Sequence, residues 1–168
     1  MLIKWTVWTL VLSLAAMTGC SGYVNIPSED GSVASENANR TRVQDIQIQA
    51  INAVIDRQHL AGPIRVTLVA GSLDEAYDTV LPQIRVDAVG PGDSATTTVA
   101  MKVTGVRIRA YEGQVDLAVS GASSVDALVT VSLKTAPFNA WWIERVHPWG
   151  PIVDPTPAPT TQPATTVE

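Results

Sequence analysis

The sequence has few of the residues on which catalytic and metal sites depend. It contains one cysteine, Cys20, so no disulfide can form within the chain, and its two histidines, His59 and His147, stand far apart. No HExxH set of metal ligands, glycine-rich phosphate loop or GxSxG nucleophile motif is present. We therefore expect a protein that is not an enzyme and that needs no metal or cofactor.

The sequence also lacks an excess of positive charge and a long apolar run. Its formal charge is −5, which argues against nucleic acid as a partner and against electrostatic docking on anionic lipid. The apolar stretch at residues 5–16 carries no charge and follows Lys4. It is shorter than the roughly 20 residues that a membrane-spanning helix needs. A basic start, a short apolar segment and small residues after it are typical of a secretory signal peptide.

The end of this segment adds an attachment point. The sequence MTGC at residues 17–20 resembles the lipobox of bacterial lipoproteins, with Gly19 and Cys20 at its last two positions and Met in place of the usual first Leu. The resemblance implies cleavage before Cys20 and lipidation of that residue by a diacylglyceryl thioether, often with a further acyl chain such as palmitate. Two or more chains anchor a protein stably. Ser21, the residue after the cysteine, resembles the default sorting signal, which implies the outer membrane facing the periplasm. The alternatives are an ordinary secretory signal and a retained membrane anchor.

Composition divides the chain into four parts. After the signal peptide at residues 1–19, we expect a lipidated tether over 20–34, rich in Ser, Gly and Pro, and one α+β domain over 35–149. The remaining residues, 150–168, are rich in Pro and Thr and are predicted to be a disordered tail.

Apolar periodicity predicts the elements of the first half of the domain. We expect helices over 36–59 and 73–81 and strands over 64–70 and 84–89. Capping-box patterns at Thr41 and Ser72 indicate helix starts, so the ordered part of the first helix could begin only at Thr41.

The second half of the domain predicts strands joined by tight turns. A two-residue turn at Glu112-Gly113 would place Ile108 opposite Leu117 on an apolar side. The same turn would place Arg109 opposite Asp116 on the polar side, a favourable cross-strand pair. The predicted fold is therefore α+β, with a long N-terminal helix packed on an antiparallel sheet that ends in a three- to four-strand meander. In element order alone, this outline resembles cystatin-like and NTF2-like cones.

Three tryptophans near the end of the domain are the candidate binding residues. Trp141 and Trp142 are adjacent, so on a strand they point to opposite faces, and Trp149 follows closely. A tryptophan exposed beside Arg145 would form a recognition surface. The competing interpretation, which we favour from sequence, is that the helix or the returning tail covers it.

These observations predict a membrane-anchored lipoprotein of the cell envelope that acts as a non-enzymatic binding or structural module. Its partner would be an envelope protein or a glycan. Two alternatives stay open. One is a small-ligand carrier with an apolar pocket between helix and sheet, and the other is a small hydrolase that pairs His147 with a carboxylate.

Overall fold

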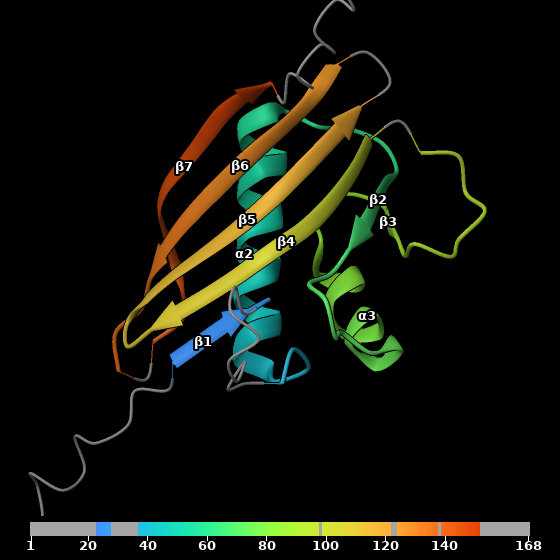
Figure 1. Ribbon diagram of the computed structural model, residues 1–168. Coiled ribbons are helices and arrows are strands. Elements are labelled where there is room, and N and C mark those ends of the chain that lie inside the picture. Colours follow the sequence, from blue (N-terminus) through green and yellow to red (C-terminus); the bar gives the residue numbers. More distant parts are fainter. Residues whose placement is uncertain (1–22, 28–36, 98, 122–123, 138, 152–168) are drawn as a thin grey trace, which may run out of the picture.

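The computed structural model describes residues 23–27, 37–97, 99–121, 124–137 and 139–151, which form the elements of Figure 1. Within these residues the chain forms two α-helices and one mixed seven-stranded sheet, so the expected α+β class is confirmed. Neither described helix is long and apolar enough to cross a membrane. The predicted signal peptide, its cysteine and most of the predicted tail lie outside the described residues.

The elements follow one another along the chain as strands interrupted by two helical segments. The helices are α2 (Thr41–Gln58) and α3 (Asp74–Val80), and α3 continues into a 3-10 turn, η1 (Leu81–Gln83). The strands are β1 (Tyr23–Ile26), β2 (Ile64–Thr67), β3 (Ala88–Val89), β4 (Val99–Arg109), β5 (Glu112–Gly121), β6 (Ser124–Lys134) and β7 (Trp142–Pro151).

The last four strands form an antiparallel meander, and the short strands lie beside its first member. The sheet order is β3-β2-β4-β5-β6-β7, and β1 pairs with the C-terminal half of β4 on the same edge that β2 occupies at the N-terminal half. Because β2 runs parallel to both β3 and β4, the sheet is mixed rather than antiparallel as predicted. The helical crossover through α3 between β2 and the later strands allows this parallel pairing.

Helix α2 covers one face of the sheet, as Figure 1 shows. Its apolar side chains meet the inward-facing side chains of the long strands, and Ile46, Ile51, Ile108, Leu117 and Leu133 are among the largest fully buried residues. Each Å² of apolar surface removed from water stabilises the fold by about 25 cal/mol. This layer between helix and sheet is therefore the main source of stability. The layer stands without any disulfide.

The helix is shorter than the sequence predicts, and its start differs in detail. It begins at Thr41 rather than 36, and Arg40 is its N-cap residue, so the predicted capping box at Thr41 does not form. At α3 the N-cap is Leu73, which is 59% exposed, and the Ser72 hydroxyl instead donates to the carbonyl of Val69. The second capping-box prediction is therefore also wrong.

Side chains end β2 earlier than its β-branched sequence predicts. The amide of Leu68 donates to the Tyr77 hydroxyl at 3.1 Å, and the amide of Val69 donates to Oε1 of the buried Gln47 at 3.0 Å. These donors are satisfied by α3 and α2 instead of by a neighbouring strand. The strand predicted over 84–89 is likewise reduced to its last two residues.

The turn of the first long hairpin lies two residues earlier than predicted, which shifts the cross-strand pairs next to it by four residues. The turn is at Ala110–Tyr111, where Ala110 has a φ of 51°, and Arg109 lies opposite Glu112. Gly113 belongs to β5 and faces α2, where an added Cβ would overlap Cδ1 of Ile46. Gly113 is therefore required for close helix–sheet packing rather than for a turn.

Two strands of the sheet extend into the segments that the sequence assigns to the tether and to the tail. Residues 23–26 form β1 within the sheet, so this part of the predicted tether belongs to the domain. At the other end β7 extends to Pro151 and includes two residues assigned to the tail.

Candidate functional site

The outer face of the sheet, opposite α2, is the candidate functional site. Alternation along β4, β5, β6 and β7 sends apolar side chains toward α2 and polar ones outward. No helix or strand among the described residues lies over this outer face (Figure 1). Its surface therefore consists of the polar and aromatic side chains that the strands present in lateral rows.

A chain of hydrogen bonds crosses the outer face from β4 to β7. Asp116 lies at its centre, forming an ion pair with Arg107 and accepting a hydrogen bond from the Thr130 hydroxyl at 2.6 Å. The same Thr130 oxygen accepts a hydrogen bond from the indole Nε1 of Trp149 at 2.8 Å. Thr130 thus uses both its donor and its acceptor capacity, and the chain fixes the orientation of Trp149.

Trp149 is held in place yet remains exposed. Its side chain is 66% accessible, and the ring of His147 packs edge-on against it with centroids 4.5 Å apart. A large aromatic ring that is already oriented loses little conformational entropy on binding, which is a property of recognition residues.

The structure brings three of the four predicted binding residues to the outer face and separates the fourth. Trp142 lies opposite Lys134 and Arg145 opposite Ser132, both on the outer face with Trp149. Trp141 packs against the core on the α2 side, where the Arg42 guanidinium lies 5.4 Å from its ring centroid. The prediction that adjacent tryptophans point to opposite faces is confirmed.

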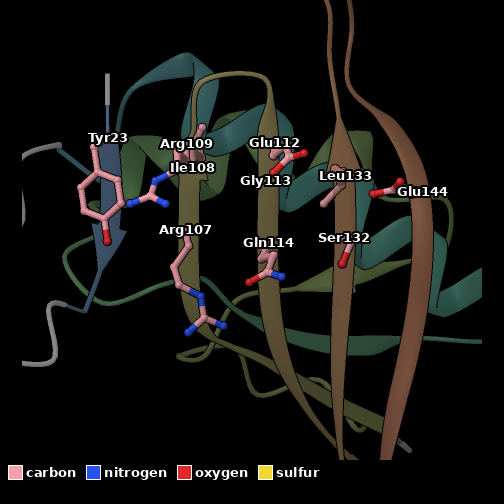
Figure 2. A pocket seen from close by; sticks show the side chains of 10 residues that line it. All are labelled: Tyr23, Arg107, Ile108, Arg109, Glu112, Gly113, Gln114, Ser132, Leu133 and Glu144. Carbon is pink, nitrogen blue, oxygen red and sulfur yellow. The ribbon is translucent and has the colours of Figure 1, made fainter. Parts of the chain in front are cut away.

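A shallow hollow of about 390 Å³ lies on the same face near the end of the sheet (Figure 2). Five of the seven strands, β1, β4, β5, β6 and β7, line it with side chains that include Tyr23, Arg109, Gln114, Ser132 and Glu144. Arg109 lies over the Tyr23 ring at 5.7 Å from its centroid. The lining is polar and open to solvent, which suits an extended or branched polar partner better than an enclosed apolar ligand.

Among the described side chains of β4, β5, β6 and β7, the outer face carries more positive than negative charge. These cations are Lys102, Arg107, Arg109, Lys134 and Arg145, and these carboxylates are Glu112, Asp116 and Glu144. The whole chain carries −5, so the charge distribution is asymmetric. A local excess of cations favours an acidic partner on this face.

The ion pair between Lys134 and Glu144 on this face raises the pKa of the lysine. Nζ of Lys134 lies 2.6 Å from Oε1 of Glu144. The hydrogen bond and the charge of Glu144 raise the pKa of the Lys134 ammonium above its ordinary value. Lys134 is therefore a cation in the neutral range, and its charge is balanced by the paired carboxylate of Glu144.

The residues expected in the alternative functions occupy other environments. Within the described part of the chain, the His147 ring packs against Trp149, and no group of His, Cys, Asp and Glu side chains could hold a metal ion. His59 is the C-cap of α2 in a left-handed conformation. The space between α2 and the sheet, where a carrier would need a pocket, is occupied by fully buried side chains such as Ile46, Met101 and Leu117.

Comparison of the chain with protein-family models, curated proteins and solved structures found no match.

Sequence reasoning missed the residues that orient Trp149. The sequence pattern predicts Arg109 as the cross-strand partner of Asp116, whereas the structure pairs Asp116 with Arg107 and Thr130. The alternation of polar and apolar residues over strands of ten or eleven residues was the available signal. It predicts a whole polar face, and with only one long helix available that face must be left open.

Proposed function

We propose that this protein is a lipoprotein of the cell envelope, anchored through lipid on Cys20, that binds an acidic envelope protein or glycan on the outer face of its sheet. The observation that carries the binding role is the exposed Trp149, held by Thr130 and Asp116 on a face with excess positive charge. Aromatic and arginine side chains supply most of the energy in recognition surfaces. The lipobox resemblance of residues 17–20 supports the anchoring.

The anchoring is tested by replacing the attachment residue. We expect Cys20→Ser to remove the lipid and to shift the protein from the membrane fraction to the soluble fraction. The matched control is Ser21→Ala, which leaves the cysteine in place and should stay with the membranes. A Cys20→Ser protein that still sediments with membranes, and that detergent alone releases, would contradict anchoring through this residue.

The binding role is tested by removing the oriented aromatic side chain. We expect Trp149→Ala to reduce retention of the purified protein on isolated cell-wall glycan, or its crosslinking yield to an envelope protein in cells, at least several-fold. Leu73→Ala is the control, because Leu73 is also an exposed large apolar residue but lies at the start of α3, off the outer face. Equal losses in both variants, or none in either, would refute binding through the outer face.

A further inference from the structure

One end of the sheet lies very close to the expected lipid attachment point. β1 begins at Tyr23, three residues after Cys20. Three Cα–Cα steps span at most about 11 Å, so a lipid on Cys20 leaves no room for a long flexible spacer. Tyr23 pairs with Arg109 at the end of β4, immediately before the Ala110–Tyr111 turn. A lipid on Cys20 would thus hold this turn and its neighbours at the membrane surface.

This end of the sheet, here called the anchor end, consists of one lateral row of residues and the adjacent turn. The row runs across the strands as Tyr23, Arg109, Glu112, Lys134 and Trp142, and the turn is Ala110–Tyr111. Backbone bonds keep the turn close to β6, since the amide of Thr135 donates to the carbonyl of Tyr111 at 2.9 Å.

Three half-exposed aromatic side chains gather at the anchor end. Tyr23 is 51% exposed, Tyr111 52% and Trp142 48%. Tyrosine and tryptophan are enriched at membrane–water interfaces because their rings are apolar while their hydroxyl or indole N–H groups remain hydrated. Three such residues beside a lipid attachment point have the chemistry of an interfacial aromatic belt.

Basic side chains accompany these aromatic residues. Arg109 lies over the Tyr23 ring, and Arg42 donates to the carbonyl of Ala110 in the turn. Guanidinium groups next to interfacial rings can reach lipid phosphates while their stems cover apolar surface. The row also contains one carboxylate, Glu112, which lies between Arg109 and Lys134, so cations outnumber carboxylates within it.

The opposite end of the sheet gives the orientation that this docking would produce. β7 starts at Trp142 in the anchor end and finishes at Pro151, which lies opposite Ala127. Ten strand residues cover about 30 Å. The Pro/Thr-rich segment after residue 151 would therefore leave the domain on the side away from the membrane, as would the part of the outer face around Trp149.

We propose, resting on the proposed lipidation of Cys20, that the anchor end docks onto the phospholipid bilayer with Tyr23, Tyr111 and Trp142 at the level of the headgroups. The strands then point away from the membrane, and Trp149 remains accessible to a partner. A face-down arrangement, with the whole outer face on the bilayer, is the main competing orientation.

The test uses the chain from Cys20 onward, which retains every described residue, attached through its only thiol to a maleimide lipid. The vesicles contain phosphatidylethanolamine and phosphatidylglycerol with brominated acyl chains, which quench the fluorescence of nearby tryptophans. The two variants compared are Trp142→Phe and Trp149→Phe, each checked for native circular dichroism. The remaining tryptophan, Trp141, is common to both.

We expect the quenched fraction to be at least roughly twofold higher in Trp149→Phe than in Trp142→Phe, because only Trp142 of the two lies at the interface. Equal quenching of the two variants, a reversed order, or no quenching in either would overturn the docking. Because the maleimide supplies the anchor, these outcomes are independent of whether the cell lipidates Cys20. A mature protein without acyl chains would instead refute the proposed lipoprotein.

Discussion

Replacing Gly113 with alanine tests the packing of α2 on the sheet. In the structure, a Cβ at this position would overlap Cδ1 of the fully buried Ile46 and lie 3.2 Å from Cζ3 of Trp141. Something in this packed layer must move to admit the methyl group. If Gly113 instead formed a turn with Glu112, the added methyl would not meet the helix.

The expected destabilisation follows from two opposing effects. Overpacking a well-packed core costs about 1–3 kcal/mol. Gly113 does not have a positive φ, so alanine can adopt its backbone conformation. Alanine also restricts the unfolded chain, which stabilises the folded state by about 0.4–1 kcal/mol. We therefore expect Gly113→Ala to lower the free energy of unfolding by about 1–2 kcal/mol, as measured by urea denaturation.

A double-mutant cycle identifies the source of this loss. Ile46→Val removes Cδ1 and alone should cost about 0.5–1.5 kcal/mol. If the added methyl group overlaps Cδ1 of Ile46, the free energy of unfolding of the double variant should exceed the value expected from adding the two single effects by about 1 kcal/mol or more. Additive effects, or a Gly113→Ala variant as stable as the parent, would refute the register and the close helix–sheet approach described above.

Three further predictions concern polar groups of the fold and the outer face. Thr130→Val should remove two hydrogen bonds, lower stability by about 1 kcal/mol and change the fluorescence emission of Trp149. Gln47→Leu should cost about 1–3 kcal/mol because the buried amide of Val69 loses its acceptor, as chemical denaturation would show. Although Asp45 is exposed, partial desolvation of its carboxyl raises its pKa above the ordinary value of 3.8, so its ionised form is disfavoured in the folded state. Asp45→Asn should therefore stabilise the protein slightly above the raised pKa, with the gain disappearing below pH 3.8 in a pH series of unfolding experiments.

Each of these predictions has a contradicting outcome. Ser132→Ala, at a neighbouring position on the outer face, should leave the tryptophan emission unchanged. If Ser132→Ala changes the emission as much as Thr130→Val does, Thr130 does not orient Trp149. Gln49→Leu, on the same helix but only half-buried, should lower the free energy of unfolding little. A loss of stability equal to that of Gln47→Leu would show that the effect comes from helix propensity rather than from the hydrogen bond to Val69. A gain from Asp45→Asn that persists unchanged at pH 3 would exclude ionisation as its cause.

Side-chain parity could be predicted from the sequence, whereas register could not. The alternation through Val106, Ile108, Val115 and Leu117 placed these residues on one face, and the structure confirms it. Moving the turn by two residues shifts the pairs by four, an even number that preserves this parity, so the apolar pattern cannot distinguish the predicted turn from the observed one. The deciding contact is between Gly113 and Ile46, which no local pattern contains.

Tertiary contacts also limit how well the helix starts and the candidate site can be predicted from the sequence. Residues with capping-box spacing lie at both helix starts, but Arg40 and Leu73 occupy the N-cap positions. The opposite orientation of Trp141 and Trp142 could be predicted from strand geometry alone. The hydrogen bond from Trp149 to Thr130 could not, because it depends on the pairing of β6 with β7 and on the irregular register between them.

The intact mass of the mature N-terminal peptide, purified from membranes in detergent, tests the central claim most directly. The account predicts a chain that begins at Cys20 and carries the added mass of a diacylglyceryl group, with or without a further acyl chain on its amine. A mature protein that begins at another residue, or that begins at an unmodified Cys20, would contradict it.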